Sequence, residues 1–495
     1  MEGLEQPRKR QRKALDGSTR SNEGVNKPYP SSEPDSDSDS ELPQYLQPLQ
    51  DHKTSTASDN FYLDTIDRTV LDFDFSKECS VSLSKTNVYA CLVCGKYFQG
   101  RSVTSPAFNH AINQHHHVYL NLKTEGFYIL PDNYKLTDPE TLRKLDDIIA
   151  VLNPTYKLEE IDTIPQQALD LKRIPYDVGY VGLNNVSSSS DYANVVIQLM
   201  CHIDPIRRFY MALNYSDDGH SYSPLNAEFG LLMRKLWSNK LYKPHVSPHE
   251  LLKLISVKQQ QSPKGVLVWL LNHLHMGLVK AIDTNKKQKK SSIISKSVQG
   301  SIKITRIAVE SKDINGKTQF ITKDSGTVHS KTKFWLLTVK PPTSPLFSLG
   351  LKVPEVSLET LLEKYNGVCQ THVNETEVHQ YKLTGHLPPY MIIHIDRNLE
   401  GGGDISPTVV KYPRVLDMSP YGDSRANYAL VANIVFKINP ETKTRSWMIH
   451  LQKTSTEWVT IQDLQVRKCE PELMFLDTSY LQLWKRIDVT VNNNK

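Results

Sequence analysis

GLNNVSSSSDYANVVIQL, which runs from Gly182 to Leu199, is the stretch that decides the fold of this 495-residue chain. Its second half carries apolar residues three and four positions apart, from Tyr192 to Leu199, and this spacing predicts an amphipathic helix. Asp191 stands at the N-terminus of that helix, where a carboxylate can accept hydrogen bonds from the free N–H groups of the first turn. The same place would also stabilise a thiolate. We therefore expect Asp191 to cap the helix, behind a loop of four serines.

Length and composition predict a soluble, intracellular protein of two or three domains. The chain is 39% hydrophobic and 23% charged, which is ordinary for globular proteins. Six scattered cysteines are too few for a disulfide framework and favour a reducing compartment. The chain start resembles no signal peptide, and no run of about 18 apolar residues is long enough to span a bilayer. With 59 basic and 54 acidic residues, any RNA contact must come from local patches.

Residues 1–60 contain few apolar side chains and are predicted to be a disordered tail. The basic cluster RKRQRK at 8–13 is typical of a nuclear-import signal, with a solvated run of charges as the alternative. An acidic serine run, SSEPDSDSDSE, follows at 31–41, and its serines are candidates for phosphorylation. The tail therefore predicts localisation in the nucleus rather than a folded domain.

The rest of the chain divides into two globular regions, 61–165 and 170–490. The first ends with a predicted helix, DPETLRKLDDIIAVL, that starts at Asp138 and leads into a polar connector with a boundary near 165–175. The second mixes helices in its first third with later strands, which indicates an α+β fold. Predicted strands in it are FWLLTV at 334–339, PYMIIHI at 389–395 and ALVANIVFKI at 429–438, and predicted surface loops are the lysine run at 286–290 and GGGD at 401–404.

Cysteines and histidines in the first region have the spacing of a zinc site. CLVCG places Cys91 and Cys94 as in a zinc knuckle, and NHAINQHHH at 109–117 follows closely. Zinc prefers four nitrogen or sulfur ligands in a tetrahedron, and four protein ligands close the site to catalysis. We predict Cys91, Cys94, His110 and His116 as the ligands of one structural zinc ion. His115 or His117 in place of His116 stays open, as does a buried cysteine pair beside surface histidines.

CLVCGKYFQGR, followed by the histidine-rich stretch and VYLNL, resembles the zinc finger of ubiquitin proteases. Some members of that family hold the C-terminus of ubiquitin with a pocket arginine, and Arg101 matches it. Two departures, Gln99 and Pro106, stand where versions with more zinc ions carry further ligands. The resemblance therefore implies a small α/β module with a single zinc ion. Whether Arg101 captures ubiquitin or is an ordinary surface arginine stays open.

The opening stretch resembles the nucleophile box of ubiquitin-specific proteases, G-L-x-N-x-G-N-T-C-Y-x-N-x-x-L-Q, which have a papain-like fold. Counted back from the matching tyrosine, the position of the catalytic cysteine is Asp191. Towards the end of the chain, YALVANIVF, RSWMIHL and WVTIQDLQV resemble the histidine box. In that alignment Ser446 stands where the catalytic histidine belongs, and Gln462 stands in place of its Asp or Asn partner. The resemblance thus implies a protease fold with a vacated catalytic triad.

Other residues offer poor replacements for the missing nucleophile and base. Cys201 lies ten residues along the predicted helix from Asp191, which is about 15 Å. His450 is four residues from Ser446, about 13 Å along a strand. Ser190 is the remaining candidate nucleophile, but it needs a base within reach. Lone Cys369 and Cys469 are interpreted as packing residues.

The order of these pieces resembles the inactive ubiquitin-specific-protease-like splicing factors, known as the snRNP-assembly-defective family. That family implies a nuclear, non-catalytic protein that binds tri-snRNP proteins and possibly snRNA, and supports assembly or stability of the tri-snRNP. Two alternatives stay open: a diverged isopeptidase that uses Ser190, and an adaptor that reads ubiquitin through the zinc finger. The resemblance covers residues 61–486 and rests on ECSVSLS, YACLVCGKYFQGR, LPDNY, GLNNV with DYAN, LMRKLW, HVSPHELL, LPPY, WVTIQDLQV and LQLWKR.

Overall fold

The computed structural model describes most of the chain after residue 61, and residues 57–495 cluster as one compact unit. The described residues are 62–186, 190–213, 222–255, 262–282, 291–314, 317–322, 327–342, 354–374, 376–398, 405–422, 425–439, 441–442 and 444–487. Three predicted features lie outside them: the tail with its basic cluster and acidic serine run, the lysine run at 286–290, and the GGGD loop. Among these residues, no helix has the length and apolar character that a membrane crossing requires.

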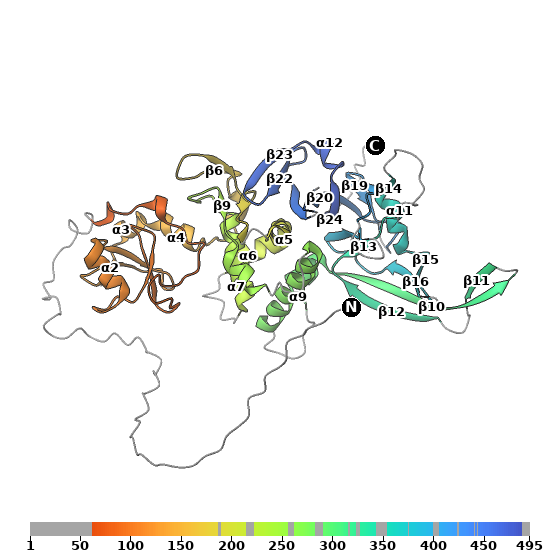
Figure 1. The fold of residues 1–495 in the computed structure, drawn as a ribbon, viewed down its shortest axis with the longest axis horizontal. Helices are drawn as coiled ribbons and strands as arrows, with labels where there is room; N and C mark the ends of the chain where they lie inside the picture. The colour runs from red at the N-terminus through yellow and green to blue at the C-terminus, as the bar shows by residue number, and fades with distance from the viewer. Residues whose placement is uncertain are drawn as a thin grey trace, which may run out of the picture. The chain divides into compact units, whose positions relative to one another are not determined.

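Residues 62–152 form a small α/β module around an antiparallel sheet of order β2-β1-β3-β4-β5 (Figure 1). Its strands are β1 (Val88–Cys91), β2 (Tyr97–Gln99), β3 (Val118–Asn121), β4 (Phe127–Ile129) and β5 (Tyr134–Lys135). The helices are α2 (Pro106–Gln114), α3 (Pro139–Arg143) and α4 (Asp146–Leu152), with a short 3-10 turn at Arg68–Val70. Strand residues 88–91 and 118–121 are buried throughout, because helices and loops cover both faces of this sheet.

The helix predicted from Asp138 is two helices in the structure. Asp138 caps α3 by accepting a hydrogen bond from the backbone N–H of Thr141, as its position in the sequence suggests. Leu145 then leaves helical geometry, with φ −109° and ψ 0°, and is buried. Both halves of the predicted segment are helical, and the break between α3 and α4 falls where Leu145 packs in the module core.

The second region is built around an eight-stranded sheet of order β13-β17-β24-β20-β21-β22-β23, with β19 paired to β20. Helices α5, α6, α7, α9 and α10 share a core with one face of this sheet, and α5 packs directly on β21. The other face shares a second core with α11 and the base of a further sheet. Strand bounds are β13 (Leu337–Val339), β17 (Tyr390–Ile395), β19 (Val415–Asp417), β20 (Asn427–Ile438), β21 (Arg445–Gln452), β22 (Trp458–Gln462), β23 (Gln465–Cys469) and β24 (Thr478–Ile487).

The helices precede most of these strands in the sequence, as the α+β prediction requires. Their bounds are α5 (Asp191–Cys201), α6 (Asp204–Ala212), α7 (Pro224–Leu236), α8 (His249–Leu254), α9 (Pro263–Ile282), α10 (Ile293–Val298), α11 (Leu358–Leu362) and α12 (Pro471–Met474), with 3-10 turns at Ile161–Thr163 and Glu363–Tyr365. Nine of the eleven residues of α5, from 193 to 201, are buried. The predicted amphipathic helix is therefore a central helix, because other helices also cover its second face.

A further sheet has the order β11-β10-β16-β15, with β12 paired to β10. Figure 1 shows β10 and β12 running out as a long ribbon with β11 at its tip. Its strands are β10 (Gly300–Ile314), β11 (Lys317–Thr322), β12 (Val328–Phe334), β15 (Asn366–Asn374) and β16 (Glu377–Leu383). The predicted strand FWLLTV is divided, since β12 ends at Phe334 in this sheet and β13 begins at Leu337 in the large one. Two-stranded pairs complete the fold: β6 (Gln167–Leu169) with β7 (Pro175–Asp177), β8 (Gly182–Leu183) with β9 (His245–Val246), and β14 (Glu355–Ser357) with β18 (Val409–Lys411).

Candidate metal centre and altered catalytic centre

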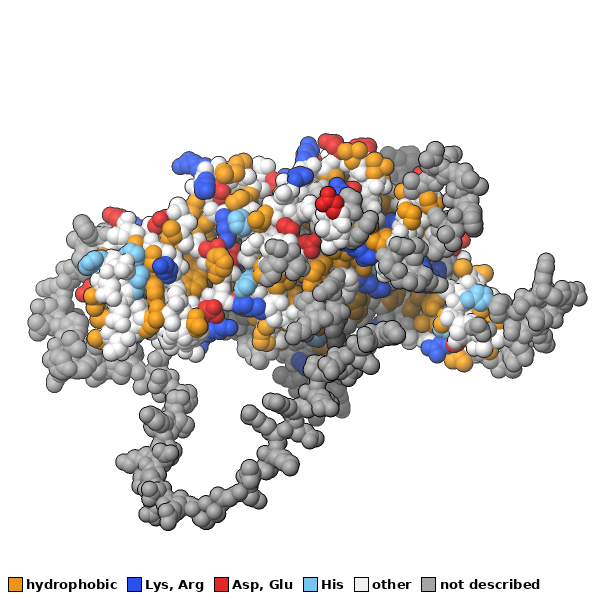
Figure 2. Space-filling model, in the orientation of Figure 1, with side chains coloured by type: hydrophobic (Ala, Val, Ile, Leu, Met, Phe, Trp, Pro, Cys, Tyr) orange, Lys and Arg blue, Asp and Glu red, His pale blue; other side chains and the backbone are white. Residues whose placement is uncertain are grey.

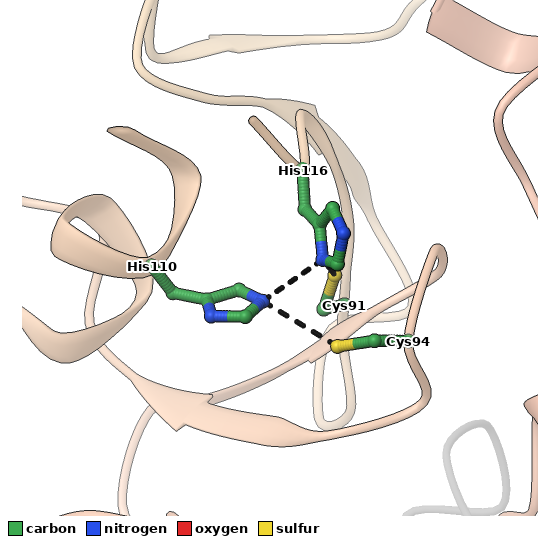
Figure 3. A group of neighbouring side chains, drawn as sticks. All are labelled: Cys91, Cys94, His110 and His116. Atoms are coloured by element: carbon green, nitrogen blue, oxygen red, sulfur yellow. Dashed lines mark hydrogen bonds between the residues drawn. The ribbon is translucent and has the colours of Figure 1, made fainter. Parts of the chain in front are cut away.

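Four side chains of the N-terminal module converge on one point (Figure 3). The ligand atoms of Cys91, Cys94, His110 and His116 all lie within 4.8 Å of one another. The Cys94 Sγ is 3.4 Å from His110 Nε2, the Cys91 Sγ is 3.6 Å from His116 Nδ1, and the two ring nitrogens are 3.1 Å apart. Among the described residues, this is the one group of three or more such side chains close enough to share a metal ion.

Local backbone geometry brings these side chains together. Cys91 ends β1, and the turn to Cys94 is closed by hydrogen bonds from Gly95 N to Cys91 O and from Cys91 N to Lys96 O. Gly95 has φ +73°, and a Cβ there would lie 2.3 Å from a backbone oxygen, so the knuckle requires glycine. His110 projects from α2. His115 then adopts a left-handed conformation, with φ +57°, and turns His116 back towards the cysteines.

Three separations among these ligand atoms fit a tetrahedral zinc ion. With Zn–S near 2.3 Å and Zn–N near 2.0–2.1 Å, tetrahedral angles require S···N separations of about 3.5 Å and N···N separations of about 3.3 Å. The measured 3.4, 3.6 and 3.1 Å agree with these values. The hydrogen bond between the two cysteines lowers the pKa of the Cys94 thiol and raises that of the Cys91 thiol. One sulfur thus favours the thiolate, which is the form that binds zinc.

The other candidate residues of the module lie outside the cluster. His115 is exposed, while His117 makes a 2.7 Å hydrogen bond to Leu130 O and contacts the ring of Tyr62. Arg101 donates to Asn133 Oδ1 at 2.7 Å and lies over the ring of Tyr128, 5.1 Å from its centroid. The structure therefore brings together the predicted four residues and separates them from both alternative histidines.

The second site lies at the N-terminus of α5. The helix begins at Asp191, as predicted, but the residue at the cap position is Ser190. The Asp191 carboxylate instead joins two elements: Oδ1 accepts from Tyr192 N at 2.9 Å and Oδ2 accepts from Trp447 N, on β21, at 3.1 Å. Partial burial raises the pKa of Asp191 above its ordinary 3.8. Asp191 therefore connects the helix to the strand, rather than acting as a simple N-cap.

Ser446 and Gln462 lie beside this carboxylate. Ser446 precedes Trp447 on β21, and the Gln462 side chain on β22 donates from Nε2 to Ser446 Oγ at 2.7 Å. The structure thus brings the three predicted positions, 191, 446 and 462, to one place. Their side chains form a carboxylate, a hydroxyl and an amide, none of which is a general base with a pKa near neutral.

The remaining candidate nucleophiles are not activated. Ser190 is buried, and its hydroxyl donates to Asn185 Oδ1 at 3.0 Å, which is an amide oxygen and not a base. Cys201 lies at the far end of α5 and is fully buried, and this burial raises the pKa of its thiol. The structure therefore agrees with the predicted distance between Cys201 and the altered centre.

Asp463 is a site residue that the sequence analysis missed. Its carboxylate accepts from Asn185 Nδ2 and from Asn194 Nδ2, both at 3.0 Å, and its carbonyl accepts from Leu183 N at 3.0 Å. Gly182 packs so closely that a Cβ there would lie 2.8 Å from the Asp463 oxygen. The signal was present, since both asparagines belong to the quoted nucleophile box and Asp463 directly follows Gln462 in WVTIQDLQV.

Comparisons with known proteins agree with both sites. The family model described as ubiquitin carboxyl-terminal hydrolase matches residues 181–484, well over half of the chain. The chain belongs to this family. A second model, a zinc finger in ubiquitin hydrolases and other proteins, matches residues 79–141. This family of zinc fingers implies zinc binding, and the Cys/His cluster lies within the matched range.

The relatives of this family member extend over most of the chain. "Probable mRNA-splicing protein ubp10" of Schizosaccharomyces pombe is 36% identical and is matched over 88% of this chain and 91% of its own length. Human "Ubiquitin carboxyl-terminal hydrolase 39" is 37% identical over 88% of this chain and 81% of its own length. The crystal structure of an essential yeast splicing factor superposes with a TM-score of 0.71 at 28% identity, and covers 86% of this chain and 100% of that one.

These findings confirm the predicted fold class and resemblance. The hydrolase fold of this family member is α+β and follows a ubiquitin-hydrolase-type zinc finger, and its relatives include proteins named as splicing factors. The matched ranges fall inside the predicted regions 61–165 and 170–490, whose exact limits stay predictions.

Proposed function

We propose that this chain is a non-catalytic pre-mRNA-splicing factor of the nucleus, which binds the tri-snRNP and supports its assembly or stability. The observation that carries the proposal is the group of Asp191, Ser446 and Gln462, which the resemblance aligns with the catalytic triad and which lie together in the structure. The splicing process is suggested by the name of the fission yeast relative, which is matched along 88% of this chain. A fold built to hold a protein substrate keeps a surface that can serve binding alone.

The chemistry of the centre supports a pseudoenzyme. Asp191 is held by two backbone N–H groups and cannot replace a thiolate as the attacking nucleophile. Ser446 cannot accept a proton as an imidazole does. Its hydroxyl oxygen accepts a hydrogen bond from the Gln462 amide. Ser190, the predicted alternative nucleophile, donates to an amide oxygen. Cleavage of ubiquitin conjugates is therefore not part of the proposed function.

The zinc finger is proposed to hold one structural ion through Cys91, Cys94, His110 and His116. Four protein ligands leave no open position for a substrate or an activated water molecule. Gln99, at a position where multi-zinc versions carry a cysteine, accepts a hydrogen bond from Ser82 Oγ at 2.8 Å, as an ordinary polar side chain does. An ubiquitin-reading role of Arg101 is not favoured, since Asn133 and Tyr128 already position the guanidinium.

One sheet face offers a local surface for the proposed snRNA contact. The face shown in Figure 2 has basic side chains interspersed with acidic and apolar ones, so overall charge does not direct RNA to it. On the sheet of β10, β12 and β16, however, Lys303 is directly opposite both Lys331 and Lys382, and Lys333 lies on the same face. All four are exposed. Like charges directly opposite one another destabilise a sheet, and phosphate groups would relieve that repulsion.

The opposite face of this sheet explains why the lysines point outward. Ile302 and Leu383 alternate with Lys303 and Lys382 and are buried in the core shared with the large sheet. Because side chains alternate along a strand, burial of this apolar set directs the lysines to solvent. The lysine run at 286–290, which is predicted to be a surface loop, lies outside the described residues.

The proposal is tested by purifying the tagged full-length chain from nuclear extract at moderate salt. The co-purifying RNAs are sequenced and the proteins are identified by mass spectrometry. We expect enrichment of the tri-snRNP RNAs and their core proteins. Recovery of polyubiquitin and its carriers without snRNAs would contradict the proposal and would reopen the search for a nucleophile.

A further inference from the structure

A second group of reactive side chains lies away from the altered catalytic centre. His450 on β21 has its Nε2 3.0 Å from Asp477 Oδ2, in the segment between α12 and β24. Its Nδ1 is 3.6 Å from the Sγ of Cys469, the last residue of β23, and 2.8 Å from the hydroxyl of Thr460. A cysteine, a histidine and an aspartate are thus connected in series. Cys469 also packs against the core on one face of the large sheet, as we interpreted it, so its side chain combines packing with these polar contacts.

The two ring nitrogens of His450 have different partners, which defines a direction for proton transfer. A carboxylate can only accept, so Nε2 carries its hydrogen and donates it to Asp477. The lone pair of Nδ1 then faces two donors, the Thr460 hydroxyl at 2.8 Å and the Cys469 thiol at 3.6 Å, and it can accept the thiol proton. The resulting imidazolium remains paired with Asp477. Asp477 and Cys469 contact opposite nitrogens of the His450 ring. The three residues are therefore arranged as a proton relay and not as a metal site.

The surroundings favour the charged form of the pair. His450 is almost completely buried, which by itself lowers its pKa, but Asp477 and Cys469 raise that pKa above the ordinary 6.5. Burial likewise raises the pKa of the Cys469 thiol, but hydrogen bonds from His450 and Thr460 lower it below the ordinary 9.0. A buried imidazolium beside a thiolate is the arrangement that makes cysteines reactive at neutral pH.

The residue that carries the sulfur lies at an edge of the large sheet. β23 is the last strand of the large sheet, and its residues 465–468 are exposed. Cys469 is partly exposed, whereas His450 behind it is not. The thiol therefore belongs to a partly exposed residue, and its base is protected in the interior.

We propose that Cys469 is a modification site that reacts with hydroperoxides, with His450 as its base and Asp477 as the residue that orients His450. The thiol proton moves to Nδ1, and the sulfur attacks one peroxide oxygen. The S–O bond forms as the O–O bond breaks, and the leaving hydroxide takes the proton from His450. Cysteine and hydrogen peroxide thus yield a sulfenic acid and water, with sulfur oxidised by two electrons and peroxide reduced. This proposal does not depend on the splicing role.

The test uses the purified, zinc-loaded full-length chain and two probes. Hydrogen peroxide with dimedone reports sulfenic acid, and iodoacetamide reports the thiolate, with both adducts located by peptide mass spectrometry. Cys369 on β15 is exposed and serves as the internal control. At about pH 7, where an ordinary thiol is only a few per cent thiolate, we expect Cys469 to react faster than Cys369 despite its lower exposure.

Matched variants separate activation from simple exposure. Asp477→Asn keeps the side-chain shape at a partly exposed position and removes the charge that holds the imidazolium. We expect the Cys469 rate to fall at least about threefold and its rate–pH profile to move to higher pH, since a half-unit rise in pKa lowers the thiolate fraction by about that factor. The Cys369 rate should stay constant and controls for the reagents, and absence of label on the fully buried Cys201 shows that the chain is folded. A Cys469 rate no higher than that of Cys369, or unchanged in Asp477→Asn, would overturn the proposal.

Discussion

Replacing Asp74 by asparagine will strongly destabilise the protein, because this carboxylate connects the zinc finger to the hydrolase-like region. Asp74 lies before β1, whereas its partners belong to α7 and the segment that follows it. Its Oδ1 is 2.9 Å from Lys235 Nζ, and its Oδ2 is 3.3 Å from Lys243 Nζ and accepts from Ser247 N at 3.0 Å. The side chains of Asp74 and Lys235 are only 9% and 7% exposed, so water cannot replace the lost partner.

The magnitude follows from this burial. Removing one member of a buried ion pair leaves the other charge without compensation and costs about 3–5 kcal/mol. Burial alone would raise the pKa of Asp74, but Lys235 and Lys243 lower it below its ordinary 3.8. A carboxylate with a depressed pKa stabilises the folded state above its unfolded pKa and loses this contribution as pH falls through the folded value. The difference between the wild type and Asp74→Asn should therefore shrink below about pH 4.

Equilibrium denaturation in urea at neutral pH, followed by tryptophan fluorescence, measures the effect. Asp72→Asn is the matched control, because Asp72 also pairs with Lys243, at 2.6 Å, but through side chains that are 27% and 31% exposed. A solvent-accessible pair contributes about 0–1 kcal/mol, so this partly exposed control should lose much less stability than Asp74→Asn. Equal losses of stability in the two variants would refute the reasoning that burial makes the Asp74 pair strong.

Three further predictions concern the zinc finger, the altered centre and the lysine face. Cys94→Ser should release the zinc and lower the melting temperature, and elemental analysis that finds unchanged zinc would exclude Cys94 as a ligand. Asp191→Cys alone should react with a ubiquitin-based probe about 10²–10⁴-fold more slowly than the triple variant that also carries Ser446→His and Gln462→Asn, because the single variant lacks a base. Equal labelling of the two variants would show that a base already exists. Lys303→Glu should weaken binding of a single-stranded RNA and reduce the salt slope by about one phosphate contact, measured by fluorescence anisotropy; unchanged binding would exclude this face.

The sequence was sufficient wherever the information is local or carried by a family pattern. The CLVCG spacing identifies the knuckle, because a turn between two cysteines is closed within five residues. The apolar spacing after Asp191 identified α5 and its first residue. Patterns at 182–199 and 428–486 identified the fold that the family model confirms. These features depend on neighbours in the chain or on an order of motifs.

Only the tertiary structure decided which distant side chains meet. The choice among His115, His116 and His117 depends on one left-handed residue, whose φ cannot be inferred from three identical letters. Asp463 meets Asn185 across 278 positions, and Lys235 meets Asp74 across 161. Cys469, His450 and Asp477 come from two strands and a connecting segment, so no spacing relates them. A hydrogen bond or an ion pair acts over a few ångströms in space, and the packing of helices and sheets determines which residues come that close.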